Sequence, residues 1–129
     1  MIFLGHPYFE SQNLYIVKDQ DEILQTPPNS IVFIENIDLN IELINFCIKN
    51  NITFSLKITS IKEALFANQF GAIYLICSID LAKSIQSLAE SYLFDTKVLV
   101  QIDDDKYIEE LAKFGVDGVI FDNAIKKIL

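Results

Sequence analysis

Arginine is absent from this chain. All ten basic residues are lysines, they stand against 18 acidic residues, and the formal net charge is −8. Without arginine the chain lacks the planar two-pronged donor that proteins favour for holding phosphate and guanine. Nucleic-acid binding also draws on clustered positive charge that neutralises phosphates. We therefore expect no nucleic-acid partner.

Cysteine and histidine are nearly as scarce. Two cysteines, Cys47 and Cys77, are too few for a disulfide framework. Together with the single histidine, His6, they make no zinc-binding cluster. The sequence contains no P-loop, no G-x-G-x-x-G fingerprint and no G-x-S-x-G elbow. These absences favour a protein without catalytic activity, and any histidine-based acid–base chemistry would have to use His6.

Long hydrophobic runs are missing too. Hydrophobic residues make up 51% of the 129 residues, but no run approaches the roughly 18 to 20 residues that cross a bilayer. The amino terminus lacks the basic and apolar regions of a secretory signal. We expect a cytoplasmic protein with no membrane contact, folded as one domain over residues 1–129.

Short apolar runs recur at nearly even intervals, and segments with helical periodicity lie between them. The runs are IVFI from Ile31, ITFSL from Ile52, AIYLIC from Ala72, KVLVQI from Lys97 and DGVIF from Asp117. Strands that alternate with helices predict right-handed crossovers and a parallel sheet. Because runs such as IVFI are apolar on both faces, we expect a mostly parallel sheet of five or six strands with helices on both faces, of the flavodoxin type.

The first 30 residues predict an additional strand at the sheet edge together with a hairpin or arm. Residues 2–4 and 14–17 are strand-like, and residues 19–25 predict a short helix that the segment TPPN ends. We predict that this segment forms an interface with a protein partner of unknown identity or with a second copy of the chain. The candidate interface residues are Phe3, His6, Tyr8, Phe9 and Tyr15.

Several residues mark the boundaries of helices. Ser60 and Glu63 have the spacing of a capping box, and Gly71 and Gly115 stand where a left-handed residue closes a helix. In the closing stretch GVDGVIFDNAI we expect Asn123 to cap one more helix.

Ligands of open parallel sheets bind beyond the carboxyl ends of the strands. The candidate ligand or metal residues there are Glu35, Asn36, Asp38, Lys57, Cys77, Asp103 and Asp122. Three converging carboxylates would suit Mg²⁺, the one cofactor that the sequence suggests. The same residue types also serve as helix caps, and capping alone would explain Asp38, Ser60, Asp80, Asn123 and one of residues 103–105.

Two of these candidates are neither carboxylates nor amides. Lys57 would form a Schiff base or neutralise a charge, or its side chain would simply extend to solvent. Cys77 would be a nucleophile with a lowered thiol pKa, or a buried thiol at the end of a strand.

From Ser30 onward the segments SIVFIENID, ITSIKEAL, AIYLICSI, KVLVQIDDD and FGVDGVIFDNAI resemble a response-regulator receiver domain, which has a flavodoxin-like fold. The resemblance places Glu35 and Asn36 at the metal-binding acidic pair and Cys77 at the phosphoacceptor aspartate. It places Ile102 at the switch threonine or serine and Asp122 at the invariant lysine. It therefore implies a pseudo-receiver that is not phosphorylated and acts through protein contacts.

The closing segment also resembles the last units of phosphate-binding (β/α) barrels, with Asp122, Asn123 and Ala124 at the phosphate-binding turn. This resemblance implies an alternative fold, a (β/α) half-barrel or a dimerised fragment. Two functions follow from the sequence. The first is a non-catalytic regulatory or protein-interaction module, and the alternative is a protein or enzyme that binds a small molecule or a divalent metal at the acidic rim.

Overall fold

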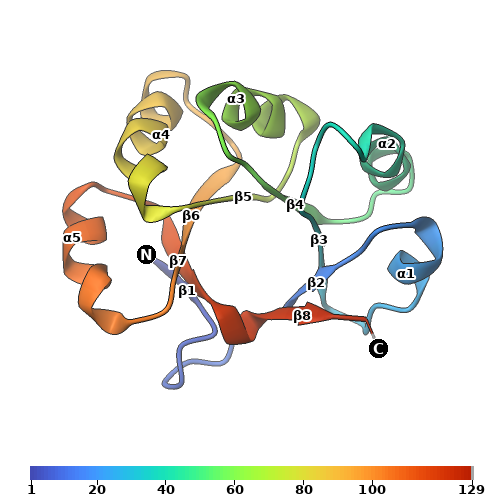
Figure 1. Ribbon diagram of the computed structural model, residues 1–129, viewed down its shortest axis with the longest axis horizontal. Helices are drawn as coiled ribbons and strands as arrows, with labels where there is room; N and C mark the ends of the chain where they lie inside the picture. Colours follow the sequence, from blue (N-terminus) through green and yellow to red (C-terminus); the bar gives the residue numbers. More distant parts are fainter. Residues whose placement is uncertain (129) are drawn as a thin grey trace.

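The computed structural model describes residues 1–128, which form eight strands, five α-helices and two 3-10 helices (Figure 1). The strands are β1 (Ile2–Leu4), β2 (Leu14–Ile16), β3 (Ile31–Ile34), β4 (Phe54–Lys57), β5 (Tyr74–Cys77), β6 (Lys97–Ile102), β7 (Gly118–Phe121) and β8 (Ile125–Lys127). The α-helices are α1 (Gln20–Leu24), α2 (Ile41–Lys49), α3 (Ile61–Phe70), α4 (Ile79–Ser91) and α5 (Ile108–Lys113). The 3-10 helices are η1 (Asp105–Tyr107) and η2 (Asp122–Ala124).

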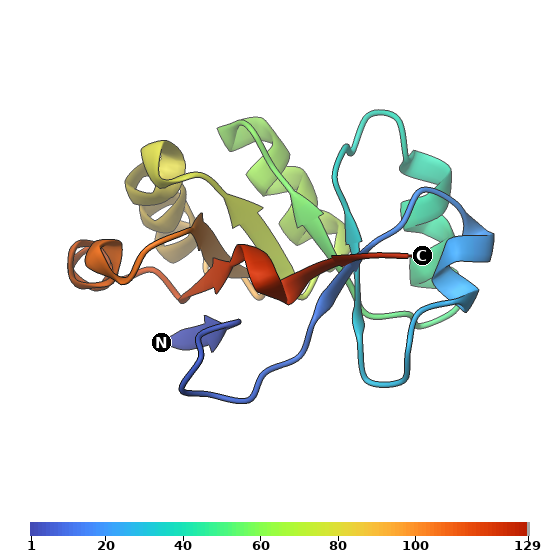
Figure 2. The ribbon, with the colours of Figure 1, turned by 60° about the horizontal axis from the view of Figure 1, so that its bottom comes forward.

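All eight strands belong to one parallel sheet, in the order β1-β7-β6-β5-β4-β3-β2-β8. β7 and β8 are consecutive in the chain, but they stand second and last in this order. The sheet must therefore curl so that β8, at its far end, returns to the neighbourhood of β7. Figure 2 shows the chain running from β7 through η2 directly into β8.

The curled sheet corrects one expectation and confirms its alternative. A sheet of five or six strands with helices on both faces is wrong, and the half-barrel is confirmed. The reason lies in the strand order, since β2 to β7 follow one another in sequence. Successive right-handed crossovers that never reverse direction place every helix on the same face. Figure 1 accordingly shows α1 to α5 outside the ring of strands.

The strands are apolar on both faces because each face packs into a different core. The outer core joins alternate strand residues to the helices, as Leu56 and Val100 do with Ala64 and Ile85. The inner core contains no residue of an α-helix and lies inside the curl. Its buried members are Leu4, Leu14, Ile31, Phe33, Tyr74, Ile76, Leu99, Ile120 and Ala124. Apolar runs thus signal burial on two faces, and here the sheet itself covers the second face.

The first two strands occur where the sequence predicts strands, and α1 lies within the predicted short helix. β1 is an edge strand, as expected, and it pairs with β7. The expected hairpin is wrong, because β2 is parallel to its neighbours β3 and β8 at the other end of the sheet. Residues 5–13 connect the two ends and form the arm.

The end of the chain also differs from expectation. Asn123 does not cap a helix, and the chain after β7 makes the single turn η2 and then the strand β8. β8 finds its backbone partners in β2, more than 100 residues away in sequence (Leu14 pairs with Ile125). This long-range pairing supplies hydrogen bonds that a local pattern cannot reveal.

The predicted helix boundaries at α3 are confirmed. Ser60 Oγ accepts a hydrogen bond from the amide of Glu63 at 3.1 Å, and Glu63 Oε1 accepts from the amide of Thr59 at 2.7 Å. Gly71 closes α3 with φ +83°. Within residues 1–128, no helix has both the length and the apolar character needed to cross a membrane.

Candidate functional site

The inner face of the sheet changes from apolar to polar at the carboxyl ends of its strands. Phe33, Ser55, Leu99 and Ile120 are buried inner residues. Side chains alternate along a strand, so the next inner positions are Glu35, Lys57, Gln101 and Asp122. All four are polar and lie at one end of the curl, where (β/α) barrels place their ligands.

A pocket of about 280 Å³ opens at the ends of three neighbouring strands, β4, β5 and β6. Lys57, Thr59, Ser78 and Gln101 supply its polar side chains. Ile58, Ile76, Cys77 and Leu81 complete the wall. Of the predicted rim residues, Lys57 and Cys77 therefore line one concave site.

Among residues 1–128, Lys57 is the only charged residue that lines this pocket. It is exposed, and within residues 1–128 no carboxylate forms an ion pair with its ammonium group. Glu35 occupies the neighbouring rim position, because Ile34 pairs with Leu56 in the sheet. Lys57 therefore has no ion-pair partner within residues 1–128, although a carboxylate stands at the adjacent rim position.

Helix α4 begins at the wall of the same pocket. Its N-cap is Ser78, whose side chain makes no capping hydrogen bond. The first amides of a helix have no partner inside the helix and carry partial positive charge. The Ser78 side chain therefore makes no capping hydrogen bond to the first amides of α4 at the pocket. The Asp80 carboxylate lies in the same first turn of the helix.

The other polar groups of the pocket are already engaged. Glu63 Oε1 holds both the amide and the hydroxyl of Thr59, at 2.7 and 2.9 Å. Gln101 Nε2 donates to Asp122 Oδ1 at 2.9 Å. This hydrogen bond joins the Asp122 carboxylate, which follows β7, to a side chain of the neighbouring strand β6.

The two cysteines are buried thiols. Burial raises the pKa of Cys77 to about 12 and that of Cys47 to about 11. A thiol with such a pKa is protonated at neutral pH and is a poor nucleophile. The Cys77 thiol is therefore an uncharged group in the wall of the pocket.

The remaining rim candidates do not converge. Asn36 Oδ1 accepts from the amide of Leu39 at 3.0 Å. Asp38, predicted to be a cap, is exposed, and helix α2 begins after Asn40, which makes no side-chain cap. Asp103 is exposed as well. Within residues 1–128, no three His, Cys, Asp or Glu side chains group so as to hold a metal ion, and the Mg²⁺ site stays a prediction.

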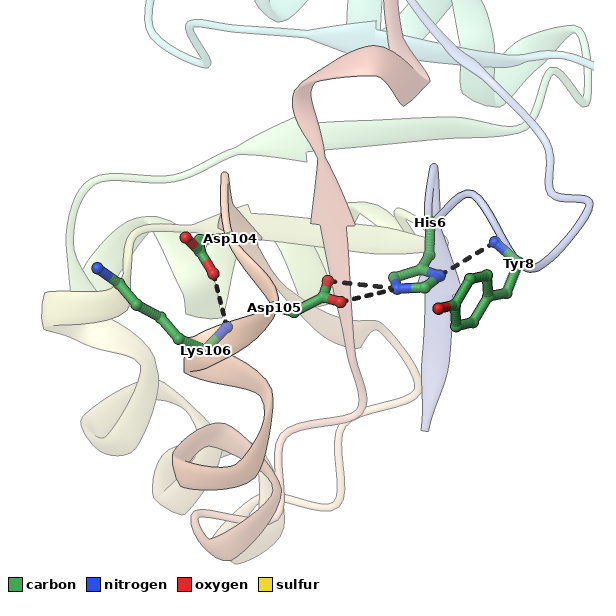
Figure 3. A network of polar contacts seen from close by, with 5 residues as sticks. All are labelled: His6, Tyr8, Asp104, Asp105 and Lys106. Atoms are coloured by element: carbon green, nitrogen blue, oxygen red, sulfur yellow. Dashed lines mark hydrogen bonds and ion pairs between the residues drawn. The ribbon is translucent and has the colours of Figure 1, made fainter.

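His6 takes part in a second polar network at this end of the sheet (Figure 3). Its Nδ1 accepts a hydrogen bond from the amide of Tyr8 at 3.1 Å, and its Nε2 lies 3.2 Å from both carboxylate oxygens of Asp105. Because the amide can only donate, these contacts assign the proton of the neutral ring to Nε2. Asp105 follows β6 and His6 follows β1, so the pair spans β7, which lies between those strands.

Aromatic side chains of the arm and of β7 surround this histidine. The ring centroids of Tyr8, Phe9 and Phe121 lie 4.7, 5.5 and 5.5 Å from that of His6. His6 is 7% exposed, whereas Tyr8 is 84% and Phe9 is 53% exposed. Of the candidate interface residues, His6 is thus an anchor inside the domain, while Tyr8 and Phe9 present surface to solvent.

Sequence reasoning missed two residues at this end of the sheet and two near the amino end of β6, at the opposite end of the sheet. Asp105 was one of three consecutive aspartates, and its partner lies 99 residues away. Gln101 was hidden inside the run KVLVQI, although a polar residue at the inner position before a strand ends is a usable signal. Asp117 Oδ2 accepts from the amide of Val98 at 2.8 Å. Asn68 Oδ1 accepts from the amides of Asp95 and Thr96 at 3.1 and 3.2 Å.

No protein-family model matches the chain, and no curated protein matches it. The resemblance to receiver domains therefore stays a prediction, and function must be argued from the site itself.

Proposed function

We propose that this domain binds a small anionic molecule, without converting it, in the pocket at the carboxyl ends of β4, β5 and β6. The observation that carries the proposal is Lys57, which is the pocket's only charged residue and forms no ion pair within residues 1–128. A cation in a concave site with no carboxylate in its wall attracts an anion.

The neighbouring groups favour the same kind of ligand. Helix α4 begins at this end of the sheet, and the hydroxyl of its N-cap residue Ser78 makes no capping hydrogen bond. Donors of this kind bind phosphate and carboxylate oxygens. At about 280 Å³, the pocket suits a molecule smaller than an ordinary drug-sized ligand, whose sites span about 300 to 1,000 Å³.

The described residues that line the pocket do not include an activated nucleophile or an acid–base pair. The Cys77 thiol is protonated because of its raised pKa, and Glu63 engages the hydroxyl of Thr59. Lys57 alone would have to act as both acid and base. Binding without turnover fits this set of groups better than acyl or phosphoryl transfer does.

Titration with inorganic phosphate, sulfate and malonate, followed by amide chemical shifts, tests the proposal. We expect saturable shifts confined to residues around Lys57, Ser78 and Gln101. Lys57→Gln should raise the dissociation constant about tenfold or more, because a charge-assisted hydrogen bond contributes about 1.5 to 3 kcal/mol. Lys62→Gln is the matched control, since Lys62 is exposed at the start of α3 and does not line the pocket. Equal affinity in the two variants would refute the assignment.

A second candidate function is protein interaction through the arm. It is favoured by Tyr8 and Phe9, which are 84% and 53% exposed on a segment that His6 and Asp105 fix in place. Rigid exposed aromatic side chains are frequent anchors of interfaces. Sedimentation analysis of Tyr8→Ser/Phe9→Ser should show loss of self-association, whereas Tyr92→Ser/Leu93→Ser should retain it. Tyr92 and Leu93 match the arm in exposure, at 67% and 84%. A wild-type chain that sediments as a monomer excludes the homo-oligomer.

A further inference from the structure

The pocket at the carboxyl ends of β4, β5 and β6 has apolar residues in its wall as well as polar ones. Among them are Ile58, Ile76 and Leu81. Both isoleucines are buried, whereas Leu81, in the first turn of α4, is only half-buried. Apolar surface of this kind leaves water when an apolar part of a ligand covers it, and its removal from water favours binding. The pocket therefore suits an anion that also carries hydrocarbon.

The polar side chains of the pocket limit how many oxygens it can hold. The hydroxyl of Thr59 and the amide of Gln101 already donate to carboxylates of the protein. The ammonium group of Lys57 forms no ion pair within residues 1–128, and the hydroxyl of Ser78 makes no capping hydrogen bond. A carboxylate has two acceptor oxygens, whereas a phosphate group presents three. Two unengaged groups match a carboxylate better than a phosphate.

Carboxylates of the protein lie around the pocket without lining it. Glu35 occupies the rim position beside Lys57, and Asp80 lies in the first turn of α4. Lys57 can balance one negative charge of a ligand, but no second cation lines the pocket among residues 1–128. Like charges that face each other across a binding site weaken binding. The surroundings of the pocket therefore favour a ligand with a single negative charge.

We propose that the ligand of this pocket is a small aliphatic monocarboxylate, an acid with one ionised group and a short hydrocarbon chain. Its carboxylate meets the ammonium group of Lys57 and the hydroxyl of Ser78, and its chain covers Leu81. This inference rests on the proposed function of the pocket, and it adds the class of anion that binds there.

The wild-type chain is titrated with acetate, propionate, butyrate and malonate at constant ionic strength, and amide chemical shifts report binding. Each methylene added from acetate to butyrate should tighten binding about fourfold, because burying one CH₂ group contributes about 0.8 kcal/mol. Propionate and malonate are a matched pair, since malonate has a second carboxylate in place of the methyl group. Malonate should bind at least about tenfold more weakly than propionate.

The variant Leu81→Ala tests the contact with the hydrocarbon chain. It should remove most of the gain from acetate to butyrate and change the affinity for acetate less than about twofold, because acetate has only a methyl group to bury. Leu65→Ala is the matched control, since Leu65 is exposed on α3 and does not line the pocket. This control should keep the fourfold steps of the wild type. The comparison of ligands uses the wild-type chain, so the test does not depend on the stability of Leu81→Ala.

Three results would overturn this inference while the proposed function stands. The first is equal affinity for acetate and butyrate, which would mean that no apolar contact is made. The second is binding of malonate as tight as that of propionate. The third is an unchanged dependence on chain length in folded Leu81→Ala. If neither the carboxylates nor phosphate give saturable shifts near Lys57, the proposed function itself is wrong and this inference fails with it.

Discussion

Gly118 is the position where a single methyl group should do the most damage. It is the first residue of β7 and pairs with Ile2 of β1. A Cβ built on Gly118 would lie 2.5 Å from the carbonyl oxygen of Ile2, 2.6 Å from Ile2 Cβ and 2.8 Å from Leu99 Cδ2. Carbon atoms pack at about 3.5 to 4.0 Å, so each contact overlaps by about 1 Å.

The loss of unfolding free energy in Gly118→Ala depends on which of these neighbouring atoms can move. Leu99 Cδ2 belongs to a side chain that can rotate, but the Ile2 carbonyl moves only if β1 moves. Overpacking in a core costs about 1 to 3 kcal/mol. Since the closest contact is with backbone, Gly118→Ala should cost about 3 kcal/mol of unfolding free energy, which corresponds to a fall of about 10 °C in Tm for a chain of this size.

Denaturant unfolding monitored by circular dichroism measures this cost, and Gly71→Ala is the control. Gly71 has φ +83° and no atom within 4 Å of an added Cβ, so its substitution costs only the strain of the left-handed conformation, about 1 to 2 kcal/mol. Both substitutions reduce the entropy of the unfolded chain alike. If Gly118→Ala is as stable as Gly71→Ala or more stable, the steric argument is wrong.

Deletion of residues 2–4 shows whether β1 is the element that yields. If Gly118→Ala displaces β1, deleting residues 2–4 should lower the free energy of unfolding much less in the Gly118→Ala variant than in the wild type. The reason is that both changes remove the same contact between β1 and β7. Additive costs would mean that the overlap is relieved elsewhere, for example at Leu99.

Two further predictions concern the polar network and the pocket wall. Asp105→Ala should lower the free energy of unfolding by about 1 kcal/mol, because His6 Nε2 loses its acceptor. Its neighbour Asp103, which is exposed, is the control and should change stability by less than about 0.5 kcal/mol when replaced by alanine. Cys77 should be inert to a thiol reagent until the protein unfolds, because burial raises its pKa from 9.0 to about 12. The folded chain then keeps a proton that the unfolded chain loses, so stability falls as pH rises above 9.0. Wild type should lose about 2 kcal/mol more than Cys77→Ala between about pH 8 and 10.5.

Simple measurements test the predictions for Asp105 and Cys77. Chemical denaturation of the two aspartate variants should rank Asp105→Ala below Asp103→Ala, and the reverse order would remove the role given to the His6–Asp105 pair. For Cys77, rapid modification of the folded protein at neutral pH, or parallel stability curves for wild type and Cys77→Ala up to about pH 10.5, would contradict a buried neutral thiol.

Strand and helix positions were largely predictable because they are local. Each core strand from β3 to β7 coincides with an apolar run, and Ser60, Glu63 and Gly71 mark the boundaries of α3 through contacts with residues at most four positions away. The candidate site was predictable only in part. Lys57 and Cys77 were identified because they follow strands, whereas Gln101 acquires its place in the pocket from the neighbouring strands.

The sequence by itself determined that this is an arginine-free, acidic α/β domain with parallel strands, because composition and periodicity are properties of the chain alone. Only the tertiary structure decided whether the sheet would be flat or curled. Both arrangements bury strands on two faces, so apolar runs such as IVFI satisfy either one. What distinguishes them is the pairing of β8 with β2, between residues that are more than 100 positions apart (Leu14 with Ile125), because β8 follows β7 directly in the chain yet stands at the other end of the strand order. Such pairing depends on the positions of all the strands between, and no local pattern encodes it.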